Sequence, residues 1–347
     1  MPSEVVLVTG VGGELGSRLL ARLGASPAFA RVLGVDTTPP RPHVLRRLGR
    51  AEFVRADIRN PLIAKIISDA RVGTVVHAAT TCHPAGPARR GALKEVNVIG
   101  TMRLLAACQR SASVRKLVVK STTAVYGADA SSPAVFTEDS ELIPASSTGY
   151  AKDAIEMEGY VRGLARRRPD LTITTLRFAN IIGPDVDTVL ARYFALPVVP
   201  SVLGYDARLQ LLHASDALTV LELATLEDRP GVFNVAADGV LTLGQALRRA
   251  GRVELPVPRP LLPSVAKVLR GARVVDFSTD QVRLLNYGRV VDTTRLKRTF
   301  GYRPRWTTAA AFEDYVRGRG LRPVVPGEHL AALADRVVAA AATGQAR

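Results

Sequence analysis

Short runs of β-branched and aliphatic residues alternate with segments of helical hydrophobic spacing through the first half of the chain. The apolar runs predict six strands, at residues 5–8, 31–35, 51–54, 72–77, 116–120 and 171–176. The segments between them predict helices at residues 16–23, 61–67, 92–108 and 151–166. This alternation is typical of an α/β protein with a doubly wound parallel sheet of the Rossmann type, whose ligand crevice lies beyond the carboxyl ends of the strands.

The regular alternation ends after Gly183-Pro184, and prolines such as those of residues 256–263 divide the rest into shorter pieces. We expect residues 1–183 to form the Rossmann domain. Residues 208–240, with a strand at 209–212, a helix at 215–226 and a strand at 232–235, are expected to return to it. Residues 184–207 and 241–322 then form a smaller, interrupted substrate lobe. Residues 323–347 are a tail whose alanine-rich part, 329–342, either forms a surface helix or frays.

The amino-acid composition is that of an ordinary globular protein and adds little about fold or function. The chain of 347 residues is 47% hydrophobic and 22% charged, and a single core stops growing at roughly 250–300 residues, which agrees with two lobes. No apolar run of about 18 residues is present and no charged segment precedes the first strand, so we expect a cytoplasmic protein without a membrane contact. Cys82 and Cys108 have no paired spacing, which predicts two reduced thiols and no metal site.

The formal net charge of +16 raises the question of nucleic-acid binding. The lysines are few and the arginines are scattered, with residues 166–168 as the longest run. Because a specific nucleic-acid site needs a focused basic face, we predict none. Attraction to small anionic ligands stays open.

A glycine-rich turn directly follows the first predicted strand. Residues 9–16 are TGVGGELG, in which Gly10, Gly13 and Gly16 have the spacing that lets a pyrophosphate approach a helix N-terminus. Twenty residues after Gly16, the second strand ends at Asp36, which is placed to accept hydrogen bonds from the adenosine ribose. This pattern favours NAD over NADP, although Arg41 and the arginines at 46 and 47 leave a 2′-phosphate open.

Further motifs follow the glycine turn in a fixed order: ADI at 56–58, VVHAA at 75–79, NVIGT at 97–101, STTAVYG at 121–127 and LRFANIIGP at 176–184. Over residues 5–315 the chain thus resembles the extended short-chain dehydrogenases/reductases of the NAD-dependent epimerase/dehydratase family. That family includes the UDP-glucose 4-epimerases, and a divergent actinobacterial branch is the nearest resemblance. The resemblance implies NAD as cofactor and these cofactor-binding residues: Gly10, Gly13, Glu14, Leu15, Gly16, Asp36, Asp57, Ile58, His77, Ala78, Ala79, Asn97 and Tyr150.

The resemblance also implies a catalytic pair. Thr122 corresponds to the hydroxyl that binds the reacting oxygen, and Tyr150 to the tyrosine that exchanges a proton with it. The family's lysine four residues later is Ala154 here, while Glu158 keeps the usual spacing. Without an ammonium, a phenol of pKa ~10 lies about three pH units, or roughly 4 kcal/mol, from ionisation at neutral pH.

Two other lysines lie close in sequence to this pair. Lys152 is turned about 200° from Tyr150 on the predicted helix, so it is a poor substitute. Lys120 precedes Thr122 by two residues, and the two side chains share a face if the strand continues that far. We therefore take Lys120 as the third catalytic candidate. The alternative, an exposed lysine at a strand end, stays open.

The substrate residues implied by the resemblance are Thr123, Asn180 and Arg208. UDP-sugar epimerases carry an arginine four residues before the histidine represented here by His213, but that position is Leu209. Arg208 is adjacent, yet a shift of one residue on a strand reverses the facing direction. We also find no clear counterpart of the family's later Arg/Asp clamp before Asp292.

Two functions stay open at this stage. One is an NAD-dependent oxidoreductase of the epimerase/dehydratase type that acts on a carbonyl or secondary alcohol, with a nucleotide sugar as one possible small-molecule substrate. The other is a catalytically weak or inactive NAD-binding sensor or scaffold. The chain keeps the cofactor motifs but lacks the family's lysine, and this combination is compatible with both functions. The sequence is also compatible with a homodimer.

Overall fold

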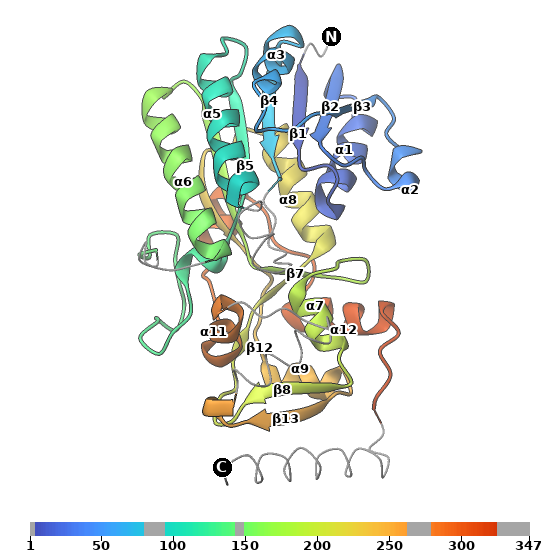
Figure 1. Ribbon diagram of the computed structural model, residues 1–347, viewed down its shortest axis with the longest axis vertical. Coiled ribbons are helices and arrows are strands. Elements are labelled where there is room, and N and C mark those ends of the chain that lie inside the picture. Colours follow the sequence, from blue (N-terminus) through green and yellow to red (C-terminus); the bar gives the residue numbers. More distant parts are fainter. Residues whose placement is uncertain (1–3, 80–93, 143–148, 262–278, 325–347) are drawn as a thin grey trace, which may run out of the picture.

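A computed structural model describes residues 4–79, 94–142, 149–261 and 279–324. Its centre is a sheet of seven parallel strands in the order β11-β6-β5-β4-β1-β2-β3. Figure 1 labels β1 to β5 of this sheet. The strands are β1 (Val5–Thr9), β2 (Arg31–Asp36), β3 (Ala51–Arg55), β4 (Val72–His77), β5 (Lys116–Thr122), β6 (Thr172–Phe178) and β11 (Gly231–Val235). The predicted doubly wound fold is confirmed, and the order of strands reverses direction between β1 and β4.

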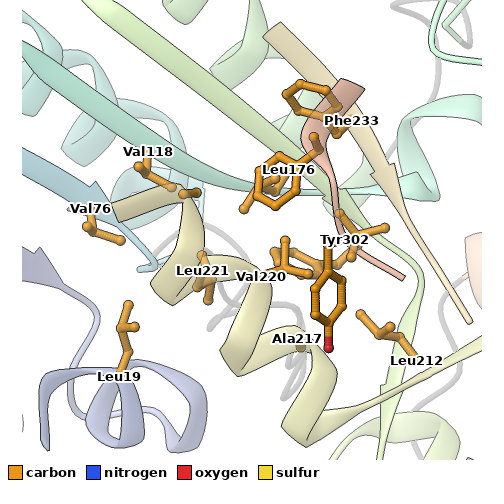
Figure 2. Packing of buried hydrophobic residues seen from close by; sticks show 14 of the residues in the cluster. Leu19, Val76, Val118, Leu176, Leu212, Ala217, Val220, Leu221, Phe233 and Tyr302 are labelled. Carbon is orange, nitrogen blue, oxygen red and sulfur yellow. The ribbon is translucent and has the colours of Figure 1, made fainter. Parts of the chain in front are cut away.

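Helices cover both faces of this sheet. On one face α3 (Leu62–Asp69), α5 (Thr101–Arg110) and α6 (Tyr150–Arg167) pack side by side, and on the other α1 (Glu14–Ala25) packs against α8 (Ala214–Leu226). Each face of the sheet packs against its helices in a separate hydrophobic core, and alternate strand residues point into the two cores. Leu7 of β1 faces α3, α5 and α6, whereas Val6 and Val8 face α1 and α8. Figure 2 shows the second core, with Leu19 of α1 and Leu221 of α8 against the sheet.

The second lobe lies at the carboxyl ends of the strands, below the sheet in Figure 1. Its aromatic core contains Tyr193, Phe194, Phe312 and Tyr315, all fully buried. Its helices are α7 (Val189–Ala195), α9 (Leu243–Arg249), α11 (Thr279–Tyr287) and α12 (Thr308–Gly318), and its strands include β8 (Val198–Val202), β12 (Leu241–Thr242) and β13 (Val253–Val257). The remaining short elements are α2 (Pro42–Leu45), η1 (Glu95–Gly100), η2 (Thr123–Tyr126), η3 (Arg259–Leu261) and η4 (Leu296–Phe300).

Several predicted elements differ in their bounds. The first helix begins at Glu14, two residues early, because Gly13 is its N-cap. The helix predicted over 92–108 is a π-helical turn, η1, followed by α5, and residues 92 and 93 lie outside the described part. The same holds for Cys82, for the last two residues of the proline-rich stretch and for nearly all of the tail. Cys108 is a free thiol, and burial raises its pKa to about 12.

The strand expected at 209–212 is in fact two short strands with different partners. β9 (Arg208–Leu209) pairs antiparallel with β12, whereas β10 (Leu211–His213) pairs parallel with β7 (Asn180–Ile182). Between them the buried Gln210 donates to the carbonyl of Ala237 and accepts from the backbone of Val291. These side-chain bonds replace the ladder at the break, so a single strand was the wrong prediction. Across the described residues, the helices are all too short or too polar to cross a membrane.

Candidate cofactor and active site

A cavity of about 670 Å³ lies between the carboxyl ends of the sheet strands and the second lobe. The sheet side contributes the glycine turn and the ends of β2, β5 and β6, and the lobe side contributes α7 and α11. Its position matches the crevice expected where the strand order reverses in an open α/β sheet. Most predicted site residues therefore face a single space.

Close backbone packing explains two of the three glycines. Gly10 has a φ of +80°, and a Cβ on it would lie 2.5 Å from the backbone of Ala79. A Cβ on Gly16 would lie 2.2 Å from the carbonyl oxygen of Gly10. On Gly13 a Cβ would meet that same oxygen at an ordinary 3.5 Å, so packing alone does not require this glycine. The space in front of Gly13, at the N-terminus of α1, suits a phosphate group.

The carboxylate of Asp36 lines the same cavity at the end of β2. Its Oδ2 accepts from the backbone N–H of Gly12 at 2.9 Å and its Oδ1 from that of Thr38 at 3.1 Å. A carboxylate has about four acceptor positions, so it can also accept ribose hydroxyls. The chain's residues thus fit a dinucleotide, with the pyrophosphate at α1 and the adenosine ribose at Asp36.

The other predicted cofactor residues divide into lining and buried groups. Asp57, held by Arg59 in an ion pair that lowers the pKa of the carboxyl, lines the cavity. Also lining it are Glu14, Leu15, Ile58, Ala78, Ala79, Asn97 and Tyr150. His77 lies behind this surface, fully buried between the hydroxyls of Thr9 and Thr101, each 2.8 Å away. Burial, helped by the charge of Lys120, lowers the pKa of His77 to about 4, so the ring is neutral near pH 7.

The three catalytic candidates converge on the cavity. Strand β5 continues through Thr122, so Lys120 and Thr122 lie on one face of it, and both line the cavity with Tyr150, the first residue of α6. The hydroxyl of Thr122 accepts from the backbone N–H of Ala124 at 3.1 Å. Its own hydrogen therefore points elsewhere, where it is available to a ligand.

The family's lysine position lies in the core. Ala154 is 3% exposed and belongs to the apolar cluster that includes Val125 and Phe178. Lys152 is half-buried and is not among the described residues that line the cavity. Eight residues after Tyr150, Glu158 is buried, as the helical register requires for the same face.

A buried polar network anchors the end of β5 against α6. Glu158 forms an ion pair with Arg177 at 2.7 Å and accepts from the hydroxyl of Ser121 at 2.6 Å. Arg177 also donates to the hydroxyl of Tyr126 at 2.8 Å. Although burial opposes its charge, Glu158 and Tyr126 hold the pKa of Arg177 above its usual value. Ser121 lies between Lys120 and Thr122, so this network holds the strand that carries both.

The substrate candidates are placed unequally. Asn180 lines the cavity, whereas Thr123 is buried and is not among its described lining residues. Arg208 is exposed and donates to the carbonyl of Ala134 at 3.0 Å, and Leu209 is buried. Among the described lining residues that come from the second lobe, the cation is Arg289, whose Nε donates to the carbonyl of Gly127 at 2.7 Å.

Sequence reasoning missed Arg289, although a signal was present. It precedes Asp292 by three residues, in the stretch where we found no Arg/Asp clamp. The sequence around Arg289 does not reveal its place at the cavity. That place depends on backbone pairing between Arg289 and the distant strand β9. The structure thus places an arginine of this stretch at the cavity.

A parallel sheet with a glycine turn at its reversal point and an acidic residue after β2 defines a dinucleotide-binding protein. The chain belongs to the NAD dependent epimerase/dehydratase family, whose model matches residues 6–236. It is thus an extended short-chain dehydrogenase/reductase, and the prediction of NAD as cofactor is confirmed.

Known proteins with similar sequences or structures include both uncharacterised and defined members. An uncharacterised protein of Mycobacterium tuberculosis is 50% identical over 335 residues, covering 96% of this chain and 89% of the relative. The dTDP-glucose 4,6-dehydratase of Bacillus anthracis, solved with NAD, has a TM-score of 0.70 at 18% identity, covering 92% and 97% of the two chains. The UDP-glucose 4-epimerase of Thermotoga maritima, solved with UDP-glucose, has a TM-score of 0.67 at 21% identity, covering 90% and 98%.

Proposed function

We propose that the protein is an NAD-dependent oxidoreductase that acts on a secondary alcohol or carbonyl of a nucleotide sugar. The observation that carries this proposal is the convergence of Lys120, Thr122 and Tyr150 on the NAD cavity. The nucleotide sugar is supported by the substrates named for similar solved proteins. The lining residues Asn180 and Arg289 add an amide and a cation suited to an anionic group.

Each of the three side chains has a distinct task in this mechanism. NAD, held by the glycine turn and Asp36, would supply the hydride acceptor and donor for the substrate carbon. Thr122 donates a hydrogen bond to the reacting oxygen, since its hydroxyl oxygen already accepts from Ala124. Tyr150 takes the proton from that oxygen or gives it back. Lys120 favours the ionised phenol by its positive charge and so replaces the missing family lysine at Ala154.

A second candidate function follows from Ala154 itself. Its position in the apolar core leaves the helix that carries Tyr150 without the ammonium used by the family. An NAD-binding sensor or scaffold would retain the glycine turn and Asp36 without needing that charge. Binding of NAD without turnover is the result that distinguishes this function from the oxidoreductase.

A substrate panel tests the proposal directly. Protein stripped of nicotinamide cofactor is mixed with UDP- and dTDP-sugars, with and without added NAD, and products are followed by mass spectrometry and nicotinamide absorbance. We expect a new epimer, a dehydrated sugar or an oxidised sugar from at least one substrate, and only when NAD is present. If NAD binds but every sugar is returned unchanged, the sensor or scaffold replaces the oxidoreductase.

The choice between NAD and NADP depends on Asp36. We expect the wild type to bind NAD more tightly, because a 2′-phosphate would meet the carboxylate and displace the ribose hydroxyl that it binds. Asp36→Asn keeps an acceptor for the backbone of Gly12 and removes the charge. Its preference for NAD should fall roughly ten- to a hundredfold, since a hydrogen bond to a charged group contributes about 1.5–3 kcal/mol. Calorimetric titration of both cofactors measures the ratio, and equal ratios for the two proteins would refute the assignment.

A further inference from the structure

The helix N-terminus at which a phosphate is expected begins with a glutamate whose side chain lines the cofactor cavity. Glu14 is the first residue of α1, lines the cavity and has a side chain that is 15% exposed. Its Oε1 lies 2.6 Å from Nε of Arg18, and its Oε2 lies 3.2 Å from Nη1 of Arg41. The positive end of the helix and two guanidinium groups therefore surround one negative charge.

The two arginines come from different parts of the fold. Arg41 follows β2, the strand that ends in Asp36, and Arg18 lies one turn along α1. Arg18 also contacts Asp185 at 2.5 Å, and the residues after Asp185, from Val186 to Leu190, line the lobe side of the cavity. The bridging chain Arg41–Glu14–Arg18–Asp185 thus links the adenosine side of the cavity to the lobe.

An exposed Glu–Arg pair four residues apart would merely support the helix, by a few tenths of a kcal/mol. Glu14 differs in three respects. It faces a cavity, it is mostly shielded from water, and it receives a second arginine from another segment. Both Arg18 and Arg41 line the cavity as well, and guanidinium groups bind phosphate oxygens at least as well as they bind carboxylates.

We propose that Glu14 is a built-in competitor of the cofactor's pyrophosphate for Arg18 and Arg41. In the free protein the carboxylate holds the two guanidinium groups and the helix N-terminus. On binding, the pyrophosphate takes over these partners, and Glu14 becomes an unfavourable neighbour that weakens retention. The inference rests on the NAD site of the proposed function and adds that NAD is exchangeable, held less tightly than the cavity would otherwise allow.

The test is binding by Glu14→Gln, with NAD, ADP and adenosine as separate probes. We expect roughly tenfold tighter binding of NAD and ADP, the effect of one unfavourable charge contact, and unchanged binding of adenosine, which lacks phosphate. The gain should shrink at high salt because screening weakens the repulsion. Retention of NAD through gel filtration should rise in parallel.

The matched control is Glu222→Gln. Glu222 of α8 pairs with Arg22 of α1 at 3.2 Å and has a side chain 19% exposed, but it is not among the described residues that line the cavity. This variant makes the same change in net charge and should leave all three affinities unaltered. Arg18→Gln and Arg41→Gln should each weaken ADP several-fold while adenosine still binds.

Three results would overturn the inference: unchanged or weaker ADP binding by Glu14→Gln, an equal gain for adenosine, or an equal gain in Glu222→Gln. Thermal unfolding of every variant separates a binding effect from a loss of fold. If wild type and variants all fail to bind NAD, the proposed function and this inference fail together. If NAD binds equally to wild type and Glu14→Gln, the inference alone fails.

Discussion

Glu158→Leu is expected to lower the free energy of unfolding by about 3–5 kcal/mol, the usual cost of leaving one member of a buried ion pair without its partner. Glu158 and Arg177 are 2% and 4% exposed. Two guanidinium nitrogens of Arg177 donate to the carboxylate, at 3.0 and 2.7 Å. Leucine fills a similar volume, so the loss comes mainly from the stranded charge of Arg177.

The double variant Glu158→Leu with Arg177→Met separates this cause from a packing defect. Removing both charges should restore a large part of the lost stability, because apolar replacement of a whole buried pair is often close to neutral. Chemical denaturation measures each variant. Glu52→Gln is the control: it breaks the exposed pair with Arg31, whose side chains are 51% and 46% exposed, and should cost at most about 1 kcal/mol. A similar loss in the single and double Glu158 variants would contradict the argument.

The sheet could be predicted from sequence because each of its strands carries its own local signal. The run at residues 5–8 is continuously apolar, and the run at 72–77 is buried throughout and interrupted only by Gly73, Thr74 and His77, as expected of central parallel strands. The glycine turn also carries a local signal, because Gly10, Gly13 and Gly16 follow β1 at a fixed spacing, although the close contact that requires Gly10 is with the distant Ala79. The cofactor class followed from these short-range features.

The rest depends on contacts between distant segments, which periodicity does not encode. The break at Gln210 arises from bonds to residues 237 and 291, and Arg289 enters the cavity by pairing beside β9. Glu14 meets Arg41 only where α1 lies beside the segment after β2, and Arg18 meets Asp185 only where the start of the lobe lies beside α1. The predicted roles of Lys120, Thr122 and Tyr150 stay predictions, although all three face one cavity.

With a substrate identified by the nucleotide-sugar panel, Lys120→Met is expected to reduce kcat/KM by about 10²- to 10⁴-fold, the range typical of lost acid–base catalysis. Methionine keeps the length of the side chain and removes its charge. Tyr150→Phe, which removes the proton carrier itself, should cause at least as large a loss. Lys152→Met is the matched control, because this neighbouring lysine is not among the described residues that line the cavity, and its activity should equal that of the wild type.

The pH profile distinguishes a lost charge from a merely displaced strand. An adjacent ammonium favours the phenolate, so its removal raises the pKa that governs proton abstraction, and the activity of Lys120→Met should recover partly as pH rises. A packing defect would lower activity at every pH and would also weaken NAD binding, which is measured separately. Adding Ala154→Lys should not rescue the variant, because that side chain would start from an apolar core position that is 3% exposed. Full activity of Lys120→Met would show that the reaction needs no charge at Lys120, and complete rescue by Ala154→Lys would show that a charge can act from the family's usual position on α6.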